Sequence, residues 1–153
     1  MADSFSQLYI QIVFAVNGRR SLIDKSWKEE LHKYISGTIT KLGHKSINVN
    51  GMQDHIHILI GLKPSVAISD LVREIKANSS KFINEEKMRN GVFNWQNGYG
   101  AFSYSRSQIQ QVFDYIENQE IHHKKKSFRE EYLELLDRFQ ISIEGKSLFD
   151  FLE

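Results

Sequence analysis

Two histidines, His55 and His57, stand two residues apart in an otherwise apolar stretch, DHIHILIGL. Residues i and i+2 of a β-strand point to the same side, so both imidazoles project together while Ile56 and Ile58 face the other way. Two neighbouring neutral imidazoles form half of a site for a divalent metal. The same spacing also fits two polar residues on a half-exposed strand.

A tyrosine and a glutamine form a second pair. Tyr115 and Gln119 are four residues apart in a stretch of helical periodicity, which places them on one face of a helix. In one interpretation Tyr115 is a nucleophile and Gln119 is a third, neutral metal ligand through its amide oxygen. In the other, Tyr115 is an aromatic residue at the rim of the core, and periodicity alone does not single it out among six tyrosines.

These residue types suit transfer of a phosphodiester. A phenol with a pKa of about 10 is a weak nucleophile at neutral pH, so in-line geometry and charge neutralisation at the phosphate matter most. A metal on two histidines and one glutamine would keep positions open for phosphate oxygens and would stabilise the leaving 3′ oxygen. The product would be a 5′-phosphotyrosine, which rejoins to another 3′-hydroxyl without ATP.

Three residues beside these pairs are each compatible with two roles. Asp54 could orient an imidazole, but adjacent strand residues face opposite ways, so a turn or capping role is favoured. His122 and His123 lead into a run of lysines and belong either to a phosphate-contacting cluster or to a solvated helix end. We do not assign them to the metal site.

The composition is that of one soluble domain, residues 1–153, with 41% hydrophobic and 25% charged residues. The absence of cysteine excludes disulfides, thiolate metal sites and thiol catalysis, and it fits a cytoplasmic protein. The first apolar run alternates with polar residues and lacks a basic n-region, and no apolar stretch approaches the roughly 20 residues that cross a bilayer. We therefore expect no membrane association.

The charge is uneven along the chain. Through Lys126 there are 17 Lys and Arg against 12 Asp and Glu, whereas from Ser127 onward there are 3 against 7. A weakly basic body favours an anionic partner. The basic side chains that would contact a nucleic-acid backbone are Arg19, Arg20, Arg73, Lys76, Lys81, Lys124 and Lys125. A solvated surface explains these residues almost as well.

Periodicity predicts the elements that carry these residues. The predicted strands are residues 8–16, 44–53, 55–62 and 98–105, and the predicted helices are residues 27–42, 68–83, roughly 107–123 and 128–139. The order β-α-β-β-α-β, followed by helix, predicts an α+β, ferredoxin-like split βαβ fold. We expect a four-stranded antiparallel sheet with helices on one face and a C-terminal tyrosine-bearing helix, leaving the other face open for a ligand or second subunit.

The sequence resembles the HUH endonucleases, and among them the small single-tyrosine transposases of bacterial insertion sequences. DHIHILIG carries the His-hydrophobe-His motif, DYIENQEIHHKKKSFREEYLELL is similar to the tyrosine helix, and WQNGYGAFSYS is similar to the preceding segment. The resemblance covers roughly residues 5–136, with the motifs in the right order. The tail, residues 137–153, carries no family pattern.

This resemblance implies a transposase that cleaves and rejoins single-stranded DNA with a divalent metal, Mg²⁺ or Mn²⁺. It implies that His55, His57 and Gln119 are metal ligands and that Tyr115 is the nucleophile. It also implies DNA ends with hairpins, and a homodimer in which the tyrosine helix of one subunit can complete the active site of the other.

Other functions are compatible with parts of the pattern. A domesticated or inactive relative would bind or nick palindromic single-stranded DNA without transposition. The two-histidine phosphoesterases of RNA ends need His-x-Thr/Ser motifs, whereas isoleucine follows both His55 and His57. A non-catalytic RNA-binding module would carry stacking aromatics on its central strands, where this chain has histidines.

Overall fold

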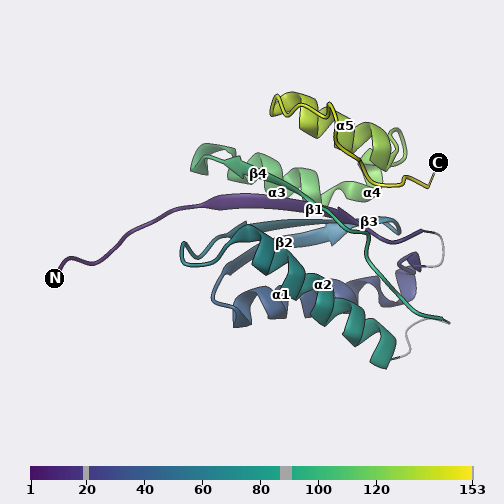
Figure 1. Ribbon diagram of the computed structural model, residues 1–153, viewed down its shortest axis with the longest axis horizontal. Helices are drawn as coiled ribbons and strands as arrows, with labels where there is room; N and C mark the ends of the chain where they lie inside the picture. Colours follow the sequence, from purple (N-terminus) through teal and green to yellow (C-terminus); the bar gives the residue numbers. More distant parts are fainter. Residues whose placement is uncertain (19–20, 87–90, 153) are drawn as a thin grey trace.

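The computed structural model describes residues 1–18, 21–86 and 91–152, so the basic candidates Arg19 and Arg20 lie outside the described residues. The elements in chain order are β1 (Tyr9–Ala15), α1 (Lys25–Lys41), β2 (Lys45–Gly51), β3 (His55–Gly61), α2 (Ile68–Glu85), β4 (Gly100–Tyr104), the 3-10 turn η2 (Arg106–Gln108), α3 (Ile109–Glu117), α4 (Gln119–His122) and α5 (Phe128–Arg138). The strands form one antiparallel sheet in the order β2-β3-β1-β4 (Figure 1). The predicted split βαβ fold is confirmed.

Helices α1 and α2 cover one face of the sheet (Figure 1). The strand side of this layer is built from alternate residues of the two central strands: Ile10, Ile12, Phe14, Ile56, Ile58 and Ile60. The helix side includes Leu31, Ile35, Ile39, Leu71 and Ile75, all of them buried. Burying each such side chain stabilises the fold by about 1.5–3 kcal/mol, so the layer fixes β3 firmly in the sheet.

The opposite face is covered as well, by α3, α4 and α5 (Figure 1), so the expectation of an open face is wrong. The apolar stripe of α3 needs a partner, and β3 supplies one between its histidines and its end. Leu59 points to this side and packs with Val112 and Ile116 in a small second core. Helix α5 then brings the buried Glu131 against His57.

The helix predicted over residues 107–123 is interrupted at Asn118, where α3 ends and α4 begins. The reason is that a side chain of β2 competes with backbone N–H groups for the carbonyls at the end of α3. The amide of Asn50 donates to the carbonyls of Ile116 (2.9 Å) and Glu117 (3.2 Å), which would otherwise accept the next helical hydrogen bonds. Tyr115 and Gln119 therefore belong to two short helices that meet at Asn118.

The two ends of the chain behave differently. The residues before β1 extend away from the domain (Figure 1), and Phe5 is almost fully exposed. Beyond α5 the chain returns to the segment before β4, where Asp150 and Gln96 exchange two hydrogen bonds of 2.8 and 2.9 Å. Phe149 is buried beside Tyr132, which anchors this tail.

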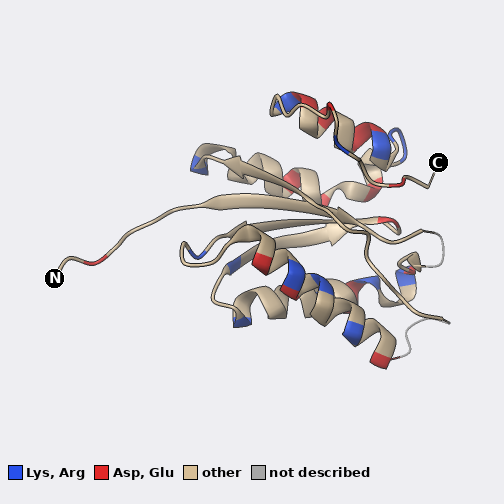
Figure 2. Cartoon of the chain, in the orientation of Figure 1, with Lys and Arg blue, Asp and Glu red and all other residues tan. Residues whose placement is uncertain are grey.

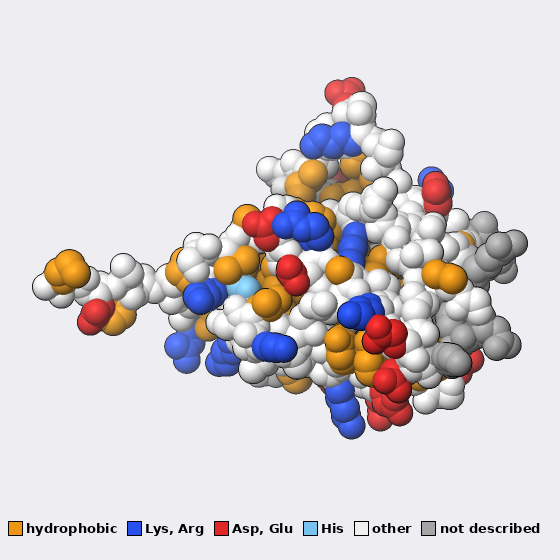
Figure 3. All heavy atoms as spheres, turned by 60° about the horizontal axis from the view of Figure 1, so that its bottom comes forward, with side chains coloured by type: hydrophobic (Ala, Val, Ile, Leu, Met, Phe, Trp, Pro, Cys, Tyr) orange, Lys and Arg blue, Asp and Glu red, His pale blue; other side chains and the backbone are white. Residues whose placement is uncertain are grey.

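Charged residues of both signs occur along the helices on both sides of the sheet (Figure 2). On the face seen in Figure 3, Lys and Arg side chains are interspersed with acidic and apolar ones. No helix in the described part of the chain is both long and apolar enough to cross a membrane.

Candidate metal centre and tyrosine site

The histidine pair lies at the start of β3, a strand with neighbours on both sides. His57 is opposite Val13 of β1 and Asn50 of β2, and both histidine side chains are fully buried. Gly51 permits the tight connection into β3, because a Cβ atom there would lie 2.2 Å from the carbonyl oxygen of His55. The sheet therefore fixes both imidazoles on one face.

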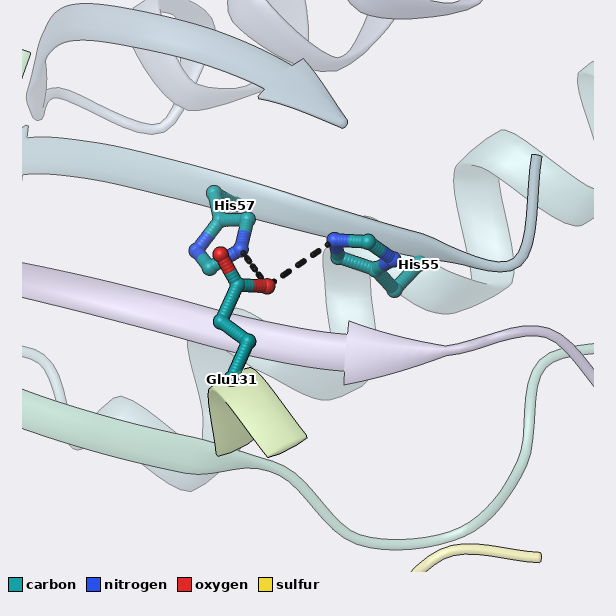
Figure 4. Close-up of side chains that lie close together, drawn as sticks. All are labelled: His55, His57 and Glu131. Atoms are coloured by element: carbon teal, nitrogen blue, oxygen red, sulfur yellow. Dashed lines mark hydrogen bonds and ion pairs between the residues drawn. The ribbon is translucent and has the colours of Figure 1, made fainter. Parts of the chain in front are cut away.

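Glu131 of α5 joins the two histidines, and the sequence analysis missed it (Figure 4). Its Oε1 atom lies 2.9 Å from Nε2 of His57 and 3.2 Å from Nε2 of His55. The signal was present, because Glu131 is a carboxylate on the apolar stripe that includes Phe128 and Leu135. A buried carboxylate on such a stripe requires a charged or hydrogen-bonding partner.

Tyr115 and Gln119 both form hydrogen bonds with the Glu131 carboxylate. The Tyr115 hydroxyl donates to Oε2 of Glu131, and the Gln119 amide donates to Oε2 at 3.0 Å. The Gln119 oxygen also lies 3.0 Å from Nε2 of His55. The structure thus brings together all four residues predicted for the site, within one chain.

A second layer of residues orients the imidazoles. Asp54 lies in the connection between β2 and β3, as favoured from the sequence, and its side chain also accepts a hydrogen bond from Nδ1 of His55 at 2.7 Å. The side chain reaches the ring from the strand end, where the face alternation no longer holds. Gln11 of β1, which the sequence analysis did not single out, donates to Nδ1 of His57 at 2.9 Å and accepts from Tyr104 at 2.6 Å.

His123 also belongs to this cluster, although the sequence analysis left it out. Its Nε2 atom lies 3.1 Å from Oε1 of Glu131 and 3.2 Å from the Gln119 oxygen, and its Nδ1 atom donates to the Lys126 carbonyl at 2.7 Å. The turn after α4 brings the ring back to the site. His122 instead stacks on the ring of Tyr115, with centroids 4.6 Å apart.

The charges in this buried cluster compensate one another. Burial alone would lower the pKa of His55, but hydrogen bonds to Asp54 and Glu131 raise it to about 9. Burial would likewise raise the pKa of Glu131, but the nearby His57 and hydrogen bonds from the imidazoles hold it below its usual range. Burial and the Glu131 charge both raise the pKa of Tyr115, so its phenol is protonated at neutral pH.

The cluster fits a divalent metal. One ligand atom from each of His55, His57 and Glu131 lies within 4.8 Å of the others, and the amide oxygen of Gln119 is adjacent. Imidazole nitrogens together with carboxylate and amide oxygens form a donor set that suits Mn²⁺ and, through its oxygens, Mg²⁺. Phe128 closes one side by stacking on the His55 ring, with centroids 4.0 Å apart.

Lys76, a candidate for DNA contact, is engaged inside the fold. Its amine donates to the carbonyls of Gln96 and Gly98, both at 2.7 Å, and it lies over the ring of Phe14. Burial lowers the pKa of Lys76 to about 8. This lysine supports the segment before β4.

The other basic candidates lie on the surface. Arg73 pairs with Asp70 at 2.6 Å and Lys81 approaches Glu85 at 3.9 Å, each on α2. Lys124 and Lys125 are exposed in the turn after α4. Exposed pairs of this kind contribute little to stability, so these side chains are available to a partner at small cost.

In this chain the central strand of a split βαβ sheet presents a His-hydrophobe-His pair to a helical tyrosine. This arrangement is that of the single-tyrosine class of HUH transposases. The family model described as "Transposase IS200 like" matches residues 4–119 of this chain. The chain belongs to this family. The resemblance found in the sequence is therefore confirmed, whereas Glu131 and the rest of α5 lie beyond the matched residues.

Individual relatives agree with this assignment. The ISDra2 transposase TnpA of Deinococcus radiodurans is 24% identical over 118 residues, which are 74% of this chain and 84% of the relative. The crystal structure of a protein from D. radiodurans R1 shares this fold, with a TM-score of 0.60 at 22% identity, covering 78% of this chain and 95% of the other. A REP-associated tyrosine transposase bound to a REP hairpin has a TM-score of 0.57 at 16% identity, covering 80% and 74%.

Proposed function

We propose that this chain is a metal-dependent transesterase that cleaves and rejoins single-stranded DNA through a 5′-phosphotyrosine. One observation carries the proposal: Glu131 touches both the Tyr115 hydroxyl and the two histidines of the HUH motif. A nucleophile and a set of metal ligands that share one carboxylate lie close enough to act on one phosphate.

The ligands that would hold the metal are His55, His57 and Gln119, with Glu131 as an additional anionic ligand. When bound, Mg²⁺ or Mn²⁺ would neutralise phosphate charge and stabilise the leaving 3′ oxygen. The chain's own residues prepare this site. Asp54 orients His55, and burial of the imidazoles excludes water.

Tyr115 would attack the phosphorus atom. The bond from phosphorus to the phenolic oxygen forms while the bond to the 3′ oxygen breaks, so one phosphodiester replaces another. Oε2 of Glu131 already accepts the hydrogen bond of the phenol and is placed to receive its proton. The 3′ oxygen leaves as a hydroxyl after gaining a proton, and a second 3′-hydroxyl reverses the reaction.

The DNA would be single-stranded with hairpin ends. A structural neighbour of this chain is described as bound to a REP hairpin, which supports this substrate class. We also propose that the protein acts as a cytoplasmic homodimer, and that Arg73, Lys81, Lys124 and Lys125 contact the DNA backbone. Their exposure is consistent with such contacts.

A covalent-adduct assay tests the proposed function. Purified protein is mixed with labelled single-stranded DNA from the flanks of its own gene and Mn²⁺, and the products are separated on a denaturing gel. We expect an adduct that disappears with chelator, with Tyr115→Phe and with His57→Ala. An adduct that persists in Tyr115→Phe contradicts the assignment, and DNA binding without any adduct favours an inactive relative.

A further inference from the structure

A cavity of about 570 Å³ is lined in part by Tyr115. It lies between the start of α3 and the end of α5. Its lining includes Tyr104, Gln108, Gln111, Tyr115, Arg138 and Phe139. Gln11, which contacts His57, also lines it, so the cavity adjoins the candidate metal centre.

The lining combines the three kinds of group that recognise a nucleotide. Tyr104 and Phe139 provide aromatic surface, with ring centroids 5.5 Å apart. Gln108 and Gln111 provide amides, which pair with base edges. Arg138 is exposed and makes no ion pair within the described part of the chain, so its guanidinium is available for a phosphate.

Helix α5 connects this cavity to the catalytic cluster. Glu131, Leu135 and Arg138 follow at i, i+4 and i+7, so one helix face places Glu131 on the histidines and the other two residues on the cavity. All three residues lie beyond the segment matched by the family model, which ends at Gln119. This wall of the cavity therefore comes from the part of the chain that follows the family-model match.

We propose that the cavity is a subsite for one nucleotide of single-stranded DNA, next to the phosphate that Tyr115 attacks. The base lies against Tyr104 and Phe139 with its edge toward Gln111, and Arg138 binds a backbone phosphate. The volume is within the range of about 300–1,000 Å³ that is usual for small-molecule sites. The proposal rests on the proposed function, because the cavity is assigned to DNA through Tyr115, the proposed nucleophile that lines it.

The first test measures binding without chemistry. The probe is a fluorescein-labelled pool of single-stranded 12-mers with random sequence, and chelator is present throughout. The full chain carrying Arg138→Gln together with Gln111→Ala is expected to bind the pool about tenfold more weakly than the unmodified chain. The matched control is Arg129→Gln on the same helix, which removes the same charge from an exposed position outside the cavity and is expected to bind normally.

The second test reads base preference. The same pool is incubated with Mn²⁺, covalent adducts are isolated, and the DNA around the cleaved phosphate is sequenced. The unmodified chain and Arg129→Gln should prefer the same base at one position next to the cleaved phosphate. The double variant should lose this base preference and keep the preferences at the other positions.

The two readouts separate this proposal from the proposed function. Equal binding and equal base preference in the double variant and in the control overturn the subsite, even when adducts form. Weaker binding of the double variant in the absence of any adduct supports the subsite and contradicts the transesterase.

Discussion

At the scale of single residues, Glu131 organises the site. Its two oxygens contact Nε2 atoms of three histidines, the Tyr115 hydroxyl and the Gln119 amide. A buried carboxylate is tolerated only where such partners compensate for lost hydration. Without a metal, the positive charge of protonated His55 offsets the negative charge of the Glu131 carboxylate. A bound metal would supply this positive charge in place of the proton.

This exchange predicts a pH dependence of metal affinity. A metal binds the deprotonated imidazole, while hydrogen bonds hold the pKa of His55 at about 9. The affinity for Mn²⁺ should therefore rise up to about tenfold per pH unit from neutral pH and level off near pH 9. Calorimetry in buffers of different ionisation enthalpy should detect about one proton released at neutral pH. An affinity that is flat between pH 7 and 9 contradicts this account.

Replacing Glu131 by glutamine keeps the shape of the side chain and removes its charge. We expect Glu131→Gln to weaken Mn²⁺ binding roughly tenfold or more, and to lower the free energy of unfolding by about 1–3 kcal/mol because charged hydrogen bonds are lost. Glu134→Gln is the control, since Glu134 is exposed and pairs with Lys126 on the surface. It should change stability by less than about 1 kcal/mol. If the Mn²⁺ affinity of Glu131→Gln is unchanged, Glu131 is not a metal ligand.

The residues that were predictable from sequence share a property: each belongs to a short local pattern. His55 and His57 form a strand pair, and Tyr115 and Gln119 have helical spacing. Glu131 stands out locally only as a carboxylate on an apolar helix stripe, and its partners depend on how α5 packs. Gln11 reaches the site through the register of β1, which no local pattern encodes.

At the scale of elements, the site depends on the connection from β2 to β3. The amide of Met52 donates to the His55 carbonyl at 3.1 Å, which closes the turn next to the first histidine. Gly51 leaves room for that carbonyl. If this turn were displaced, His55 would move with it. The rest of β3 would stay in place, because its isoleucines pack against α1 and α2.

A pair of glycine substitutions tests this dependence. In Gly51→Ala the new Cβ atom would meet backbone, so we expect stability to fall by about 1–3 kcal/mol and Mn²⁺ binding to weaken. Gly37→Ala, on the exposed side of α1 with open space around it, should instead stabilise the protein by about 0.5–1 kcal/mol. Thermal unfolding and Mn²⁺ titration measure both effects. A tolerated Gly51→Ala with normal Mn²⁺ affinity contradicts the role of the turn.

The elements themselves were largely predictable, because alternation and helical spacing are strong in this chain. The interruption at Asn118 was not, since it arises from Asn50 on a distant strand competing for helix carbonyls. The covered second face was missed for a related reason. The packing of α3 and α5 on the histidine side depends on tertiary contacts such as that of Leu59 with Val112.

At the scale of the whole molecule, one chain contains a complete set of candidate catalytic groups. The ring of Tyr115 lies 6.0 Å from the ring of His57 in the same chain, between centroids. The site therefore needs no residue from a second subunit to bring nucleophile and ligands together. A homodimer that exchanges tyrosine helices stays a prediction of the resemblance.

Mixing two inactive variants distinguishes action within one chain from exchange between chains. Tyr115→Phe retains the histidines and His57→Ala retains the nucleophile. If each tyrosine serves its own chain, the mixture should form no more covalent adduct than the separate variants. Restored adduct formation in the mixture would show that a tyrosine helix completes the site of a partner subunit.

The central claim is that Tyr115 becomes covalently linked to DNA, and mass spectrometry of the adduct tests it most directly. Trypsin cleavage after Arg106 and Lys124 releases residues 107–124, a peptide in which Tyr115 is the only tyrosine. After nuclease trimming, the account predicts this peptide with a 5′-linked nucleotide on Tyr115, formed only with Mn²⁺ or Mg²⁺. A nucleotide on a different peptide, or the same adduct in the presence of chelator, would contradict it.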